Sequence, residues 1–309
     1  MRHRASCVTR IREFFPNVTA LLLMGVLTAW ATPLAALDEA PFKAEQPLSV
    51  SEVAPGVFVH QGRYEIFTPH NSGDTANAGF IIGRDGVAVV DTGGSPRVGR
   101  ALLAAIRART KLPIKYVINT HMHPDHAGGN PAMQMVGADV IASENGRRIM
   151  AERQAPGLAN ITLRDYLRVY LDDMPIDLYY FGRGHTDNDI VIHLPTKKML
   201  IAGDLFALYG PYREVIDYTA GGSLRDWTRT LERVLQLDFD TVIPGHSGLT
   251  DRKNMEGYKD YLTRTQDMVR EMNKQKKTRD EISAVLKSDF DWGGLEMQVG
   301  LDGVITEMR

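Results

Sequence analysis

The stretch NTHMHPDHAGG, residues 119–129, places three histidines and one aspartate within six positions. Ordinary packing gives no reason for so many metal-binding side chains in one short segment. His121 and His123 are two residues apart, so on an extended backbone they point the same way and can bind one ion. Pro124 ends the extended segment and turns Asp125 and His126 toward a second point. We therefore expect this one loop to supply ligands to two metal ions.

The composition is that of a globular protein with one large core. The chain has 309 residues, of which 43% are apolar and 24% charged, and this size and balance suit a single domain. The formal charge of -2 and the pI near 6.5 lack the basic footprint of a nucleic-acid-binding protein. We expect small-molecule substrates and no nucleic-acid partner.

The first 36 residues differ from the rest of the chain. Four arginines (Arg2, Arg4, Arg10 and Arg12) precede an apolar run that is followed by small residues, a pattern that predicts a secretory signal peptide over residues 1–36. The run is shorter than the roughly 20 residues of a membrane-spanning helix, so no stable anchor is expected after cleavage. The mature chain, residues 37–309, would be one periplasmic or secreted domain. Cys7 is the only cysteine and lies in the removed segment, so metal ligands must be nitrogen or oxygen.

Short runs rich in Val and Ile alternate with segments of helical period, which is typical of an α/β protein. Strands are expected at residues 57–60, 79–83, 87–93, 115–121, 139–143, 177–182, 189–195, 198–204 and 240–246. Helices are expected at residues 96–109, 144–153, 159–171, 223–236, 251–275 and 278–287.

Further metal-binding side chains lie at or just beyond the ends of predicted strands, as His121 does. They are His185 in GRGHTDND, Asp204 in IAGDLF and His246 in VIPGHSG. Loops converge at strand ends in α/β architectures, so we expect these residues to meet the 119–129 stretch. His185 would complete the first ion's ligands, His246 would join Asp125 and His126 on the second, and Asp204 could bridge both ions.

With these residues the chain resembles the metallo-β-lactamase-fold hydrolase superfamily. The signature H-x-H-x-D-H stands at His121, His123, Asp125 and His126, and the later ligands correspond to His185, Asp204 and His246. The resemblance runs from about Val53 to about Thr250. It implies a four-layer αβ/βα sandwich, in which two mixed β-sheets are flanked by helices and the site lies at one edge between the sheets.

Imidazole and carboxylate ligands without a thiolate suit zinc, and iron or manganese is compatible with the same set. We expect two zinc ions, because a water that bridges two such ions is acidified to a pKa of about 7 and can attack at neutral pH. The predicted reaction is hydrolysis of an ester, thioester, lactone or amide-like bond, with Asp125 as the catalytic residue that orients the hydroxide. Asp91, at the end of VAVVDTG, is expected to accept the outer N–H of a metal-bound imidazole.

The segments GDTANAGFIIGRDGVAVVDTGGS and GHTDND are similar to periplasmic zinc metallohydrolases of quinoprotein relay systems and of sulfur-oxidation clusters. This branch implies a periplasmic dehydrogenase partner. Asp204 stands where the best-known β-lactamases place a cysteine, so β-lactam hydrolysis is a secondary possibility. An iron-dependent sulfur dioxygenase and a non-catalytic accessory of a quinoprotein dehydrogenase are compatible with the same resemblance. Three tyrosines after Asp204 are hypothesised to shape the substrate pocket: Tyr209, Tyr212 and Tyr218.

Overall fold

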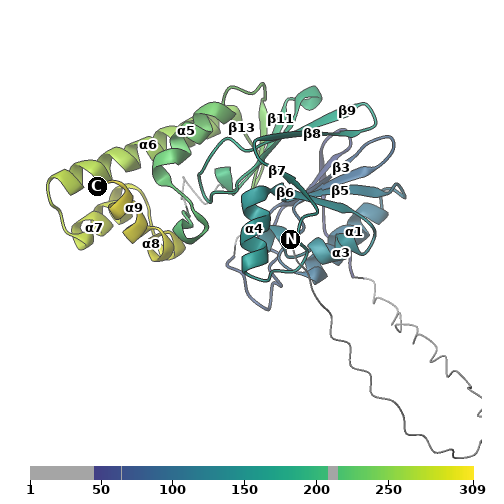
Figure 1. Ribbon diagram of the computed structural model, residues 1–309, viewed down its shortest axis with the longest axis horizontal. Coiled ribbons are helices and arrows are strands. Elements are labelled where there is room, and N and C mark those ends of the chain that lie inside the picture. Colours follow the sequence, from purple (N-terminus) through teal and green to yellow (C-terminus); the bar gives the residue numbers. More distant parts are fainter. Residues whose placement is uncertain (1–44, 64, 208–214) are drawn as a thin grey trace, which may run out of the picture. The chain divides into compact units, whose positions relative to one another are not determined.

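The computed structural model describes residues 45–63, 65–207 and 215–309 of the chain (Figure 1). The chain divides into two units, Met1–Phe42 and Lys43–Arg309, and the fold below is that of the second. The predicted signal peptide and two of the three tyrosines, Tyr209 and Tyr212, lie outside the described residues.

The first sheet has seven strands that follow one another in chain order. They are β1 (Ser51–Ala54), β2 (Val57–His60), β3 (Ala78–Ile82), β4 (Val87–Val90), β5 (Ile114–Ile118), β6 (Asp139–Ser143) and β7 (Ile161–Leu163). The pairs from β1 to β4 are antiparallel and those from β4 to β7 are parallel. The sheet is therefore mixed, as the resemblance implied.

The second sheet has six strands in the order β13-β12-β11-β10-β9-β8. Their bounds are β8 (Tyr166–Leu171), β9 (Met174–Tyr179), β10 (Val191–Leu194), β11 (Met199–Gly203), β12 (Thr241–Pro244) and β13 (Thr250–Asp251). The β11–β12 pair is parallel and the other pairs are antiparallel. This sheet is mixed as well.

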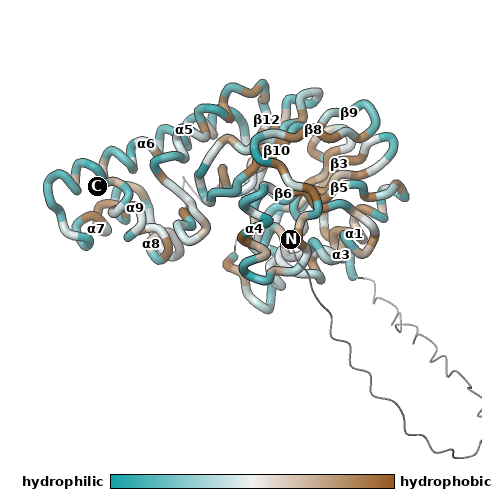
Figure 2. Tube along the Cα trace, viewed as in Figure 1, coloured by the Kyte–Doolittle hydropathy of each residue, from teal (hydrophilic) through white to brown (hydrophobic). Residues whose placement is uncertain are grey.

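Alternating side chains along the strands build three apolar layers, which hold two sheets and two groups of helices together. On β5, Ile118 packs between the sheets with Ile192 and Ile243, whereas Val117 faces Leu102 of helix α1. The first sheet is covered by α1 (Pro96–Arg107), α3 (Asn130–Gln134) and α4 (Glu144–Glu152). Figure 2 shows hydrophobic stretches along β3, β5 and β6.

The second sheet packs on helices from the C-terminal part of the chain, with a shared core that includes Leu200 of β11 and Trp227 of α5. These helices are α5 (Leu224–Val234), α6 (Arg252–Lys274), α7 (Arg279–Asp289), α8 (Gly294–Val299) and α9 (Leu301–Glu307). The order helices, sheet, sheet, helices confirms the predicted four-layer αβ/βα sandwich. Among the described residues, no helix combines the length and apolarity that a membrane crossing requires.

The helix predicted over residues 159–171 is wrong, because this segment forms β7 and β8. Leu167, Val169 and Leu171 enter the core between the sheets while Tyr166 and Tyr170 stay exposed. That alternation has the two-residue period of a strand, and six residue pairs join β8 to β9. The strand expected over residues 115–121 also stops early, at Ile118. The other five predicted helices are confirmed at α1, α4, α5, α6 and α7.

Candidate metal centre

The 119–129 stretch leaves β5 and enters a four-residue helix, α2 (Pro124–Ala127). His123 precedes this helix with extended backbone angles, φ -63° and ψ 146°, and Pro124 begins it. Proline is favoured at a first helical position, since its missing N–H has no partner to lose there. The short helix carries Asp125 and His126 side by side, so the turn separates them from His121 and His123.

The other three predicted metal ligands come from the second sheet. His185 lies in the loop from β9 to β10, Asp204 follows β11 and His246 follows β12. Because β11 and β12 are parallel neighbours, their ends bring Asp204 and His246 together. A Cβ on Gly245 would overlap Oδ1 of Asp204, so the absence of a side chain there makes room for the carboxylate.

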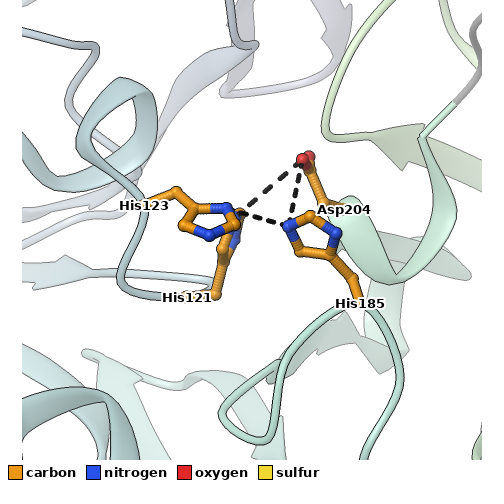
Figure 3. A group of neighbouring side chains, drawn as sticks. All are labelled: His121, His123, His185 and Asp204. Atoms are coloured by element: carbon orange, nitrogen blue, oxygen red, sulfur yellow. Dashed lines mark hydrogen bonds and ion pairs between the residues drawn. The ribbon is translucent and has the colours of Figure 1, made fainter. Parts of the chain in front are cut away.

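A first group consists of His121, His123, His185 and Asp204 (Figure 3). Nδ1 of His123 lies 3.0 Å from Nε2 of His121 and 2.9 Å from Nε2 of His185. Oδ2 of Asp204 lies 3.7 Å from Nε2 of His185 and 4.0 Å from that of His121. A tetrahedral zinc ion with bonds of 2.0–2.1 Å separates its ligand nitrogens by about 3.3 Å, close to these spacings.

A second group consists of Asp125, His126 and His246. Oδ2 of Asp125 lies 3.9 Å from Nε2 of His126 and 3.6 Å from Nε2 of His246. Asp204 also faces this group, with Oδ1 3.2 Å from Nε2 of His126 and Oδ2 3.3 Å from Nε2 of His246. All seven predicted side chains therefore meet, with the Asp204 carboxylate between the two groups.

Two histidines direct their outer nitrogen to a carboxylate. Nδ1 of His126 donates to Oδ2 of Asp91 at 2.8 Å, and Nε2 of His123 donates to Oδ2 of Asp217 at 3.0 Å. Asp91 also accepts hydrogen bonds from the backbone and the hydroxyl of Thr120, both at 2.8 Å. The carboxylate of Asp91 thus lies behind the imidazole of His126, the kind of position that the sequence predicted for it.

The other three histidines direct their outer nitrogen to a different oxygen. Nδ1 of His246 donates to the Thr75 carbonyl at 2.8 Å, and Nδ1 of His185 donates to the Val215 carbonyl. Nδ1 of His121 lies 3.1 Å from Oγ1 of Thr120. The hydroxyl hydrogen of Thr120 goes to Asp91, so its oxygen accepts from His121.

These contacts fix the tautomer of all five imidazoles, and in the neutral form of each ring the inward nitrogen carries a lone pair. Inward nitrogens 2.9–3.0 Å apart, both with lone pairs, repel each other unless a metal ion or a shared proton lies between them. Within the described part of the chain, Nε2 of His126 and Oδ1 of Asp204 are buried without a hydrogen-bond partner. The donor set and its orphaned atoms therefore fit metal ions held by nitrogen and oxygen.

Burial and charge act on the site in a way that favours metal binding. Burial lowers the pKa of His121 well below its usual value and, with the neighbouring histidines, lowers that of His185 to about 4. These two rings are neutral at pH 7, which is the form that binds metal. Burial also opposes a charge on His126, but the carboxylates of Asp204, Asp91 and Asp125 raise its pKa well above the usual value. A positive charge at this point is therefore strongly stabilised.

The sequence did not point to two of the supporting residues, Asp217 and Thr75. Asp217 lies 94 positions from His123, in a segment that looks like an insertion, and Thr75 uses its backbone oxygen for His246. No residue spacing signals such partners. Tyr218, hypothesised to shape the substrate pocket, donates its hydroxyl to Glu307 of α9 at 2.8 Å. That contact directs the hydroxyl to the C-terminal helix.

The family model described as Metallo-beta-lactamase superfamily matches residues 72–246, which is more than half of the chain. The chain belongs to the metallo-β-lactamase superfamily. The match ends at His246, the last of the seven predicted metal ligands. The protein is therefore a hydrolase of this superfamily with a candidate metal site.

Individual relatives are distant. A protein called Metallo-beta-lactamase type 2 from Bacteroides fragilis is 25% identical over 228 residues, which cover 72% of this chain and 88% of that protein. The protein of the same name from Bacillus cereus is 23% identical over 66% of this chain and 78% of its own length. The solved metallo-beta-lactamase from Pontibacter korlensis is 25% identical, with a TM-score of 0.62 over 70% of this chain and 99% of that chain. The structural match confirms the sandwich fold of this superfamily member.

Proposed function

We propose that this superfamily member is a zinc-dependent hydrolase with two metal ions, acting on an ester, thioester, lactone or amide-like bond of a small molecule. One observation carries the proposal: five imidazoles, each fixed from behind by an oxygen, turn lone pairs toward two points that share Asp204. A protein that used these histidines only for packing would have no need to fix every tautomer inward.

The residues divide naturally between two ions. His121, His123 and His185 would hold the first, Asp125, His126 and His246 would hold the second, and Asp204 would touch both. Zinc ions bound there would supply an acidified water and a Lewis acid for the substrate's oxygen. The ligand set contains no sulfur, so iron or manganese fits the same atoms, and zinc is proposed on the suitability of imidazole.

Two side chains mark the open side of the site. The side chain of Asp125 is 22% exposed and that of His123 is 19% exposed, whereas the side chains of His121, His126 and Asp204 are at most 8% exposed. Substrate and water would therefore reach the site past Asp125. Its carboxylate can accept a hydrogen bond from the attacking water and orient it toward the substrate.

A second candidate is β-lactam hydrolysis, because two of the relatives are called metallo-beta-lactamases. Asp204 makes β-lactam hydrolysis the secondary candidate, since it supplies a carboxylate where the best-known β-lactamases place a cysteine. A sulfur dioxygenase would instead require iron, and a non-catalytic accessory would bind metal without turnover. Metal content and turnover therefore distinguish these functions.

Elemental analysis of protein purified without added metal, combined with a panel of ester, thioester, lactone and β-lactam substrates, tests these candidates. We expect two zinc ions per chain and turnover of at least one substrate class. The variant in which His121 and His123 are both replaced by alanine should lose the first ion and the turnover. Iron in place of zinc, fewer than two ions, or full metal content with no turnover of any substrate would contradict the proposal.

We also propose that the protein is exported after removal of residues 1–36 and that it works in the periplasm or outside the cell. The similarity to the quinoprotein-relay branch supports a dehydrogenase partner in the same compartment. Fractionation of cells that express the full chain, compared with cells that express residues 37–309, tests export. The full chain should yield the shorter protein outside the cytoplasm, and residues 37–309 expressed alone should stay inside.

A further inference from the structure

Thr75 contacts two members of the second group at once. Its hydroxyl donates to Oδ2 of Asp125 at 3.2 Å, and its carbonyl accepts from Nδ1 of His246 at 2.8 Å. The residue is 4% exposed, so water competes little for its hydroxyl. Thr75 comes from the segment between β2 and β3, which carries none of the seven metal-binding residues.

The backbone around Thr75 is held in place independently of its hydroxyl. Asp74 accepts a hydrogen bond from Nε2 of His60 on β2 at 2.6 Å. On the other side, the Asn77 amide donates to the carbonyls of Pro244 and Ser247, both at 2.8 Å, beside His246. Loss of the Thr75 hydroxyl should therefore leave the segment, and its carbonyl contact with His246, in position.

Asp125 is the member of the second group that most needs such a contact. It lies in the first turn of the four-residue helix α2, and its side chain is 22% exposed and thus has rotational freedom. Its distances of 3.6 and 3.9 Å to the neighbouring imidazoles are too long for hydrogen bonds, so the Thr75 hydroxyl is the group that holds its Oδ2. The orientation of Asp125 therefore controls how well the second group can close on an ion.

We propose that Thr75 is a positioning residue whose hydroxyl orients Asp125 and so sets the affinity of the second group for its metal ion. This inference rests on the proposed function, which requires two ions. Hydrogen-bonded neighbours of ligating groups typically contribute about 10–100-fold to metal affinity. Loss of the hydroxyl should lower the affinity for the second ion by that factor. The affinity for the first ion should stay unchanged, because Thr75 touches none of that ion's ligands.

The test compares Thr75→Val, which removes the hydroxyl at nearly constant volume, with Thr75→Ser, which keeps it. Thr265→Val is a matched control, since Thr265 is a fully buried threonine of α6 whose hydroxyl donates to the Tyr261 carbonyl. Each full-length protein is stripped of metal and titrated with Zn2+ against a chromophoric chelator, and with Co2+ while the visible spectrum is recorded. Thermal melting of the metal-free proteins checks the fold.

We expect Thr75→Val to lower the affinity for the second Zn2+ ion by about 10–100-fold. The Co2+ spectrum should change in the second half of the titration. Thr75→Ser and Thr265→Val should bind both ions as the wild type does. If Thr75→Val does not fold, Thr75→Ala replaces it with the same expectation. Equal binding of both ions by Thr75→Val and wild type, or an equal loss of both ions, would overturn the inference. A wild type that binds fewer than two ions would instead overturn the proposed function.

Discussion

Oδ1 of Asp204 and Nε2 of His126 lie 3.2 Å apart, and within the described residues neither buried atom has a hydrogen-bond partner. Both atoms present lone pairs, because His126 donates its Nδ1 hydrogen to Asp91. Such a pair is stable in the interior only with a positive charge between its members, either a metal ion or a proton on His126, and the raised pKa of His126 shows that the neighbouring carboxylates stabilise that charge. The relationship makes Asp204 the residue through which both groups of the site are coupled.

Replacement of Asp204 by asparagine should remove at least one of the two expected ions. The amide keeps the shape of the side chain but loses the negative charge that faces His121, His126, His185 and His246. We expect turnover to fall by about 100-fold or more, in line with the large contribution of metal ions to such reactions. Elemental analysis and turnover of the best panel substrate measure both effects. Wild-type metal content in the variant would show that Asp204 is not a ligand.

Gly245→Ala should displace both the carboxylate and the backbone of Asp204, because the added Cβ would lie 2.7 Å from the Gly203 carbonyl carbon and 2.8 Å from the Asp204 nitrogen. The added Cβ would overlap Oδ1 of Asp204, and a carboxylate moved off its position binds metal poorly. Gly248→Ala is the matched control, because a Cβ at Gly248 would meet one atom, Oε1 of Gln61, at 3.8 Å. We expect metal content to fall in the first variant only, with both melting cooperatively. Equal metal content in the two variants would contradict the crowding argument.

Asp91→Ala should weaken metal binding more than Asp91→Asn. Alanine removes the acceptor for His126 and for both Thr120 donors, and it is strained at the φ of 54° that Asp91 adopts. Asparagine tolerates this backbone and keeps one acceptor oxygen. We expect a loss of about 10–100-fold in metal affinity for alanine and about 1–3 kcal/mol of stability from the unsatisfied donors. Chelator competition and urea unfolding measure the two quantities.

Asp217→Ala should lower the affinity for the first ion and leave the affinity for the second unchanged. This is the opposite of the effect expected at Thr75. Oδ2 of Asp217 holds Nε2 of His123, and no member of the second group contacts it among the described residues. Asp217→Asn retains an acceptor for His123 and should lose less. Titration of the metal-free variants with Co2+ distinguishes the two steps. A variant that loses both ions equally would indicate that Asp217 supports the loop as a whole.

His60 should make stability depend on pH. Its ring nitrogens face two acceptors, the Ser49 carbonyl at 2.8 Å and Asp74 at 2.6 Å, so the protonated ring satisfies both. Burial acts to lower the pKa of His60 and the charge of Arg63 adds to this, but the contacts with Asp74 and Ser49 outweigh them and raise it. A raised folded-state pKa gives a contribution that is complete below the unfolded value of about 6.5 and is lost as pH rises through the folded value.

The measurement is the urea midpoint of metal-free wild type and His60→Gln at about pH 5.5 and about pH 9, on either side of the histidine range. The urea midpoint of the wild type should exceed that of the variant by more at the acid pH than at the alkaline pH. His193→Gln is the control, because Nε2 of His193 contacts one neutral acceptor, the Asp238 carbonyl. A gap between wild type and His60→Gln that widens toward alkaline pH would refute the assignment.

The fold was predictable from sequence where hydrophobic periodicity and glycine or proline punctuation agree, as at β4, α1 and α5. The prediction failed at residues 159–171, where the apolar residues at 161, 163, 167, 169 and 171 match either a helix or a strand. Pairing with β9 and burial between the sheets decided for strands. A single sequence does not show which partner surface a segment meets, and that surface determines the outcome.

The residue types of the site were determined by the sequence alone: seven imidazole and carboxylate side chains, no thiolate outside the first 36 residues, and a proline that separates two ligand pairs. Only the tertiary structure decided which oxygen stands behind each imidazole. Asp217, Thr75 and Val215 reach the histidines from positions 94, 171 and 30 residues away, and two of them do so through backbone carbonyls. Every residue has a carbonyl oxygen, so such a contact leaves no mark on the sequence and arises only when the folded chain brings the loops together.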